Sequence, residues 1–151
     1  MNRSDAADSY CYPGTDVLIN QVGLRDRAQL DTYEAQVVAL NLAELSQKPI
    51  TGPFDAARLQ ETHRRIFQDV YPWAGKFRVN TGVMSKSRPQ GYVVTYGDSR
   101  YVSRELEKVF HALAAENYLR GQPLETVVNW AAHYYGELMH AIHFGRETAE
   151  P

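Results

Sequence analysis

The segment from Asn129 to His143 concentrates side chains that can carry protons or bind metals. At 100° per residue, His133, Glu137 and His140 fall within about 60° of one another on a helix, and His143 follows them. Histidine and carboxylate side chains at helical spacing can share a metal ion, as in a metal-dependent hydrolase. The alternative is that His133 and His140 are half-buried and satisfied by backbone or water, which is commoner for isolated histidines on a helix.

His143 differs from the other histidines because it comes at the predicted end of this helix, where a side chain can face a loop and a ligand. Two other stretches could carry chemistry: Phe67–Arg78, rich in aromatic residues, and Val83–Pro89, which contains Ser85 and Lys86. Aromatic residues beside proline and glycine are usually structural, and they predict a helix end packed on the core. A basic pair in a loop is usually solvated surface.

Apolar residues at helical spacing predict the elements that position these segments. Four helices are expected, over residues 26–46, 55–70, 98–118 and 124–142. Strand-forming residues punctuated by Gly82, Pro89 and Gly91 predict a β-hairpin or flap within residues 76–97. The sequence therefore predicts a mostly α fold with one β-hairpin.

Length and composition favour one globular domain. The chain has 151 residues, 44% of them hydrophobic and 23% charged. A net charge of −2 gives no basic field that would favour nucleic acid or a membrane surface. The sequence lacks both an apolar run long enough to span a bilayer and an ordinary secretory signal. With Cys11 as its single cysteine, the chain is expected in the cytoplasm, or in a host cell if a longer form carries an export signal.

In this order, the segments resemble the Fic family of protein adenylyltransferases over nearly the whole chain. The matching segments are Tyr-Pro-Gly-Thr-Asp-Val-Leu at 12–18, His-Arg-Arg-Ile-Phe at 63–67, Tyr-Pro-Trp-Ala-Gly-Lys-Phe-Arg at 71–78, the flap with Ser85 and Lys86, and Tyr135–His143. Members with this kind of N-terminus include bacterial toxins and secreted effectors. The resemblance implies a Fic-type helical bundle with a flap.

The resemblance also implies a reaction. His143 would be the general base that removes a proton from a Tyr, Ser or Thr hydroxyl of a target protein as this hydroxyl attacks the α-phosphate of ATP. Ser85, Lys86 and Arg146 would belong to the cofactor-binding set, and Glu147 would hold Mg²⁺. The flap would offer backbone edges to the target segment, as in strand addition.

The loop after His143 departs from the family pattern, which is Pro-Phe-x-(Asp/Glu)-Gly-Asn-Gly-Arg. Here Phe144 follows the histidine directly, without the proline. Glu147 keeps the position of the metal-binding acid, four residues after His143, and Arg146 precedes it. Thr-Ala-Glu-Pro at 148–151 then replaces the glycines that would close backbone N–H groups around the phosphates.

The genetic code suggests a cause for this departure. Residues 144–151 can be encoded as TTC GGG AGG GAA ACG GCC GAA CC. When a T precedes these letters, the neighbouring frame (T)TT CGG GAG GGA AAC GGC CGA ACC gives Phe-Arg-Glu-Gly-Asn-Gly-Arg-Thr. We therefore expect that a small deletion after the His143 codon shifted the frame. In that case residues 1–151 form a single Fic-like domain that lacks the part of the fold after the histidine.

Three functions follow from these observations: an adenylyltransferase with little or no activity, a non-catalytic binding module, and the metal-dependent hydrolase. An inhibitory helix of the family type, (Ser/Thr)-x-x-x-Glu-(Gly/Asn), is absent from the sequence. The nearest segment, Ser103–Lys108, ends in the wrong residue. A small antitoxin protein or a lost C-terminal part would then supply the inhibitory helix.

Overall fold

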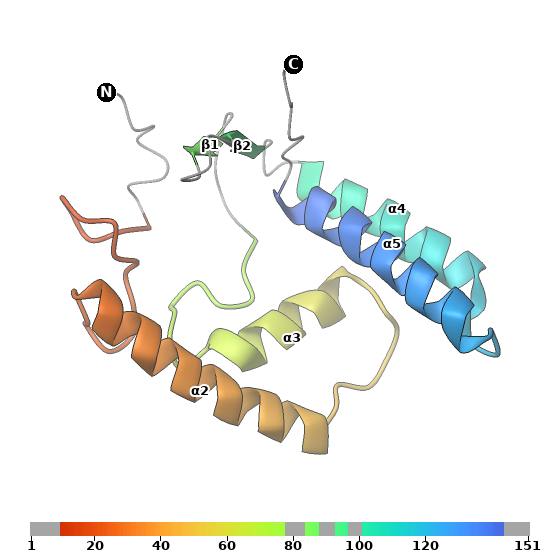
Figure 1. Ribbon diagram of the computed structural model, residues 1–151, viewed down its shortest axis with the longest axis horizontal. Helices are drawn as coiled ribbons and strands as arrows, with labels where there is room; N and C mark the ends of the chain where they lie inside the picture. The colour runs from red at the N-terminus through yellow and green to blue at the C-terminus, as the bar shows by residue number, and fades with distance from the viewer. Residues whose placement is uncertain (1–9, 78–83, 88–92, 97–100, 144–151) are drawn as a thin grey trace. The chain divides into compact units, whose positions relative to one another are not determined.

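The computed structural model describes residues 10–77, 84–87, 93–96 and 101–143, and it describes side chains over residues 10–77 and 101–138. The chain forms two compact units, described separately below (Figure 1). The first unit comprises Met1–Pro53 and Ala57–Arg78, and the second comprises Phe54–Ala56 and Val79–Pro151. The predicted mostly helical fold class is confirmed. The single domain over 1–151 stays a prediction.

Helix α2, Arg27–Gln47, is the longest element of the first unit. It begins after Asp26, whose carboxylate accepts a hydrogen bond of 2.9 Å from the Gln29 N–H. Such a cap satisfies one of the N–H groups that have no partner within the helix. At the other end, the Lys48 N–H donates to the Glu44 carbonyl. The prediction of a helix over 26–46 is confirmed to within one residue at each end.

Helix α3, Ala56–Phe67, ends three residues before the predicted limit at residue 70. The N–H groups of Val70 and Tyr71 both donate to the Phe67 carbonyl at 2.9 Å, which turns the chain out of the helix. Pro72 follows directly, and a proline disfavours helical backbone in the residue before it. The turn at residues 68–71 therefore results from the two hydrogen bonds to the Phe67 carbonyl and from Pro72.

The core of the first unit forms where residues 10–24 lie against α2 and the end of α3. Its buried members are Val17, Leu30, Val70 and Tyr71. The Gln21 N–H donates to the Val70 carbonyl at 2.8 Å, which joins the N-terminal segment to the chain after α3. Asn20 is also buried, and its side-chain amide bonds the carbonyls of Leu18 and Leu24 and the Leu24 N–H. Because each of these polar atoms has a partner, the buried amide fixes the shape of the segment.

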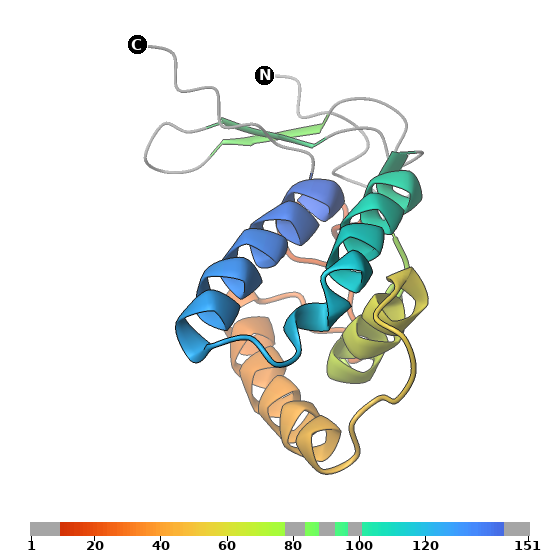
Figure 2. The ribbon, with the colours of Figure 1, turned by 90° about the vertical axis from the view of Figure 1, so that its right-hand side faces the viewer.

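The second unit contains a helical hairpin. Helix α4, Val102–Ala115, and helix α5, Leu124–His143, lie side by side in both views and are joined through the 3₁₀ turn η2, Asn117–Leu119 (Figures 1 and 2). Val102, Leu106 and Val109 of α4 and Tyr134 of α5 are buried. The predicted start and end of α5 are confirmed to within one residue. Helix α4 is shorter at its C-terminus than predicted, because the backbone turns left-handed from Asn117 to Leu119.

The second unit also holds two short antiparallel strands, β1, Met84–Ser87, and β2, Val93–Tyr96. Met84 lies opposite Tyr96, and Ser87 lies opposite Val93. They form a two-stranded sheet, so within the part of the chain that the structure describes each strand has one edge with no neighbouring strand. Both strands fall inside the range 76–97 where the sequence predicts a hairpin.

Helix α5 carries a second apolar face besides the one that includes Tyr134. Leu124, Val128 and Tyr135 recur at helical spacing, and their exposed fractions are 79%, 58% and 65%. Despite these residues, none of the helices within the described ranges is long and apolar enough to cross a bilayer.

Candidate functional site

The candidate site is the C-terminal end of α5, because His143 is the last residue of that helix. The helical backbone continues from His133 through Glu137 and His140 to His143, so all four share one rigid element. The side chains of His140 and His143 lie outside the described residues, as do Arg146 and Glu147 entirely. The structure therefore positions the backbone that precedes the predicted loop.

His133 is exposed, so the expectation that it is half-buried is wrong. Its ring makes edge contacts with Trp130 and Tyr134, each at 5.3 Å between ring centroids. Tyr134, the next residue of α5, is buried. Successive residues of an α-helix point about 100° apart, so His133 lies on a different side of α5 from Tyr134 and is exposed.

The predicted metal face is described only in part. His133 and Glu137 are both exposed. Among the side chains that the structure describes, no group of three or more His, Cys, Asp or Glu residues is arranged to hold a metal ion. The set of His133, Glu137, His140 and His143 stays a prediction, since half of it lies outside those side chains.

The predicted flap residues are neighbours on β1. Ser85 lies opposite Thr95 and Lys86 lies opposite Val94 in the antiparallel register. Their side chains fall outside the described residues, so the predicted role of Ser85 and Lys86 in cofactor binding is untested. What the structure supplies is a regular two-stranded backbone at this position.

The aromatic turn of residues 71–77 is packed on the core of the first unit, as the structural interpretation of this stretch predicted. Tyr71 and Trp73 stack with centroids 4.5 Å apart and planes 17° apart. His63 from α3 adds ring contacts of 5.9 Å with Trp73 and 4.8 Å with Phe67. This cluster attaches the turn to α3, just before the chain continues toward β1.

Two polar contacts in this cluster were missed by sequence reasoning. The Gly75 N–H donates to Nδ1 of His63 at 3.0 Å, and burial lowers the pKa of His63. The Tyr71 hydroxyl donates to the Glu34 carboxylate. Burial first, and then this hydrogen bond, raise the pKa of Tyr71. Neither contact had a local signal in the sequence, because the bonded residues are 12 and 37 positions apart in the chain.

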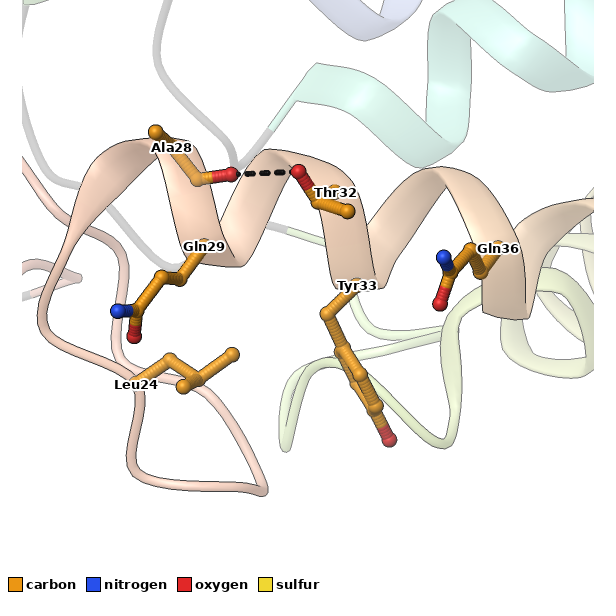
Figure 3. Close-up of a pocket in the computed structure, with 6 residues that line it drawn as sticks. All are labelled: Leu24, Ala28, Gln29, Thr32, Tyr33 and Gln36. Atoms are coloured by element: carbon orange, nitrogen blue, oxygen red, sulfur yellow. Dashed lines mark hydrogen bonds between the residues drawn. The ribbon is translucent and has the colours of Figure 1, made fainter.

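A shallow hollow of about 430 Å³ lies beside α2, in the first unit (Figure 3). Within its lining, the Thr32 hydroxyl donates to the Ala28 carbonyl at 2.9 Å. The lining residues are Leu24, Ala28, Gln29, Thr32, Tyr33 and Gln36. None of these side chains is charged, and the hollow contains none of the predicted site residues. It is therefore not the candidate site.

Comparison with known proteins gives the following relatives. No family model matches the chain. The chain is 32% identical over 141 residues to y4lH of Sinorhizobium fredii, named as a probable protein adenylyltransferase, and covers 68% of it. It is also 32% identical over 140 residues to the protein adenylyltransferase VbhT of Bartonella schoenbuchensis. Each of the two alignments covers 93% of this chain, but the chain spans only 28% of the length of VbhT.

Solved structures show the same fold. BepC, a VirB-translocated effector protein of Bartonella tribocorum solved with bound AMPPNP, superimposes with a TM-score of 0.77 at 23% identity. The superposition covers 91% of this chain and 70% of BepC. The N-terminal Fic domain of a VirB-translocated effector of Bartonella quintana, solved with bound ADP, gives a TM-score of 0.76 at 24% identity. It covers 97% of this chain and 72% of that domain.

Proposed function

Because this chain belongs to the Fic family of protein adenylyltransferases, we propose that it has the framework of an enzyme that transfers AMP from ATP to a protein hydroxyl. The observation that carries the proposal is the position of His143 at the end of α5, in a chain whose relatives are named for this reaction. That relatives of the same fold bind AMPPNP and ADP supports an adenine nucleotide as the substrate.

The proposed reaction uses His143 as general base. The imidazole takes the proton of a Tyr, Ser or Thr hydroxyl on the target protein while the hydroxyl oxygen forms a bond to the α-phosphorus of ATP. The bond from the α-phosphorus to the bridging oxygen breaks, and pyrophosphate leaves. A positioned base of this kind contributes about 10²- to 10⁴-fold to the rate.

The residues after His143 limit this reaction. Glu147 is the proposed ligand of Mg²⁺, which in such sites offsets phosphate charge, and Arg146 is the proposed phosphate contact. The Gly-Asn-Gly-Arg segment, whose glycines would close backbone N–H groups around the phosphates, is not present in residues 144–151. Preorganised donors of this kind usually supply the larger part of the stabilisation in a phosphate site, and losing one costs about 10²- to 10³-fold.

We therefore propose that the chain in this form has little or no AMP-transfer activity. The test is incubation of the full chain with ATP labelled at the α-phosphate, Mg²⁺ and candidate target proteins. The matched control is His143→Ala. Equal, background labelling in both proteins is expected. Labelling of a protein by the unmodified chain that His143→Ala abolishes would overturn the proposal of inactivity while supporting the role of His143.

The hairpin of β1 and β2 is the proposed docking element for the target. A target segment would add to a strand edge through main-chain hydrogen bonds, a mode that needs extended backbone with unpaired N–H and C=O groups. Ser85 and Lys86 lie on β1, where they would border both the target and the nucleotide.

A partner protein of the antitoxin kind is proposed as the regulator, and the cytoplasm as the location.

A non-catalytic binding module is the second candidate, favoured by the residues that replace the phosphate loop. Calorimetric titration with ATP and Mg²⁺ separates the two. Saturable binding that weakens in Glu147→Gln favours the enzyme framework, whereas no heat of binding favours the module. The metal-dependent hydrolase is tested by elemental analysis of the purified chain. Stoichiometric zinc would support a metal site formed by His133, Glu137, His140 and His143, whereas a chain without zinc would exclude the hydrolase.

A further inference from the structure

His63 is held in one defined state within the first unit. Its Nδ1 accepts the hydrogen bond of 3.0 Å from the Gly75 N–H, so the neutral ring carries its hydrogen on Nε2. The ring is half-buried, between Phe67 on its own helix and Trp73 in the turn. This hydrogen bond joins a residue of α3 to a residue of the turn that follows the helix.

The turn lies unusually close to α3 at this point. Gly75 has a left-handed φ of +77°, and a Cβ atom added there would meet the Arg64 Cβ at 2.7 Å and the Gln60 carbonyl oxygen at 2.9 Å. Inside the turn, the Lys76 N–H donates to the Trp73 carbonyl at 3.0 Å. The Gly75 N–H, in contrast, depends on His63 for its partner.

We propose that the contact between His63 and the Gly75 N–H is an acid-sensitive attachment of the turn of residues 71–77 to α3, which protonation of the imidazole opens. Protonation places a hydrogen on Nδ1, so that two donors then face each other across the former hydrogen bond. The amide of Gly75 loses its acceptor, and the turn loses a polar bond that attaches it to α3.

The elements around His63 carry charged and titratable groups. On α3, Arg64 is the next residue and pairs with Glu61 at 2.6 Å. In the turn, Lys76 follows Gly75, and the Tyr71 hydroxyl is bonded to Glu34. From the N-terminal segment, the Tyr10 ring meets Trp73 edge-on.

Burial is what lowers the pKa of His63. The attachment is therefore complete above the ordinary histidine pKa of about 6.5 and is lost as the pH falls through the lower value of the folded state.

Hydrogen exchange of the Gly75 amide tests the proposal on the full chain. Exchange is followed by NMR between pH 8 and pH 5 and corrected for the intrinsic pH dependence of amide exchange. Protection is expected to fall by about fivefold across the His63 titration, the equivalent of one neutral hydrogen bond. The protection of Leu30, in the core of the same unit, should stay unchanged and so exclude global unfolding.

Two variants complete the test. His63→Asn places an amide oxygen near the position of Nδ1, so the Gly75 amide keeps an acceptor that does not titrate, and its protection should be independent of pH. His133→Asn, at an exposed histidine, should behave as the unmodified chain does. A pH-independent Gly75 amide in the unmodified chain, an equal fall in His63→Asn, or a His63 midpoint above 6.5 would each overturn the proposal.

Discussion

The α-carbon of Gly75 packs directly against the side chain of Arg64: a Cβ at residue 75 would lie 2.7 Å from the Arg64 Cβ. Because that atom belongs to the rigid start of the Arg64 side chain and the Gln60 carbonyl is also close, the chain cannot relieve the overlap by rotating a flexible group. This contact explains physically why a glycine stands in the Trp-Ala-Gly segment.

Gly75→Ala should therefore destabilise the chain by about 2–4 kcal/mol, through steric overlap added to the left-handed backbone. The matched control is Gly14→Ala. Gly14 has a similar φ of +74° but nothing within 4 Å of an added Cβ, so only the backbone penalty of about 1 kcal/mol is expected. Urea denaturation followed by circular dichroism measures both. Equal losses in the two variants would show that packing on α3 contributes nothing.

The hydrogen bond from Tyr71 to Glu34 should make stability fall at alkaline pH. The pKa of Tyr71 is raised in the folded chain, by burial and by Glu34, so folding favours the neutral phenol. Its contribution is complete below the unfolded pKa of about 10 and decreases as the pH rises above that value. Tyr71→Phe should flatten the decrease between pH 9 and pH 11 and cost about 1–2 kcal/mol at pH 7.

Tyr33→Phe is the control for that measurement, since the Tyr33 hydroxyl reaches the Asp69 carbonyl only at 3.4 Å. Its loss should cost less than about 0.5 kcal/mol, because a long and exposed hydrogen bond contributes little. If Tyr71→Phe retained the alkaline decrease of the unmodified chain, another group would have to cause it.

The left-handed backbone after α4 offers a third prediction. Asn117, Tyr118 and Leu119 have φ values of 52°, 54° and 59°, although none is glycine. Tyr118 is held there by ring contact with Phe54 at 5.5 Å and by the Arg120 guanidinium at 5.6 Å. Asn117 is exposed, so its substitution isolates the backbone term.

Asn117→Ala should cost about 1 kcal/mol, and Asn117→Gly should be neutral or more stable by up to about 1 kcal/mol. The thermal midpoint of unfolding measures the order of the three proteins. The opposite order, with alanine above glycine, would show that residue 117 is not left-handed in solution.

A fourth prediction concerns the gene. The codons for residues 144–151 should contain the neighbouring frame that encodes Phe-Arg-Glu-Gly-Asn-Gly-Arg-Thr. Sequencing the coding DNA checks this directly, and codons incompatible with that frame would end the hypothesis of a shifted reading frame.

The sequence predicted the elements that depend on local pattern. The bounds of α2 and of α5 were predicted to within one residue from apolar residues at helical spacing. Contacts made across the chain were not visible. The buried amide of Asn20 and the partners of Tyr71 and His63 depend on how residues 10–24, α2 and α3 meet.

For the candidate site too, the sequence predicted what depends on local pattern and missed what depends on contacts across the chain. His143 could be found because a helix ends at it, whereas the exposure of His133 depends on which face of α5 packs against α4. Ser85 and Lys86 were predicted in a flap and lie on β1, but no local pattern reveals what their side chains contact.

The bond between the Gln21 N–H and the Val70 carbonyl makes α2 and α3 the interior of one closed loop. Closing this loop costs conformational entropy, which the burial of apolar residues at both ends of the loop must offset. During synthesis, the first unit can therefore reach its final form only after residue 70 has left the ribosome. Until then Leu30 of α2 cannot be buried against Val70 and Tyr71, so α2 lacks the core that holds it in the folded unit.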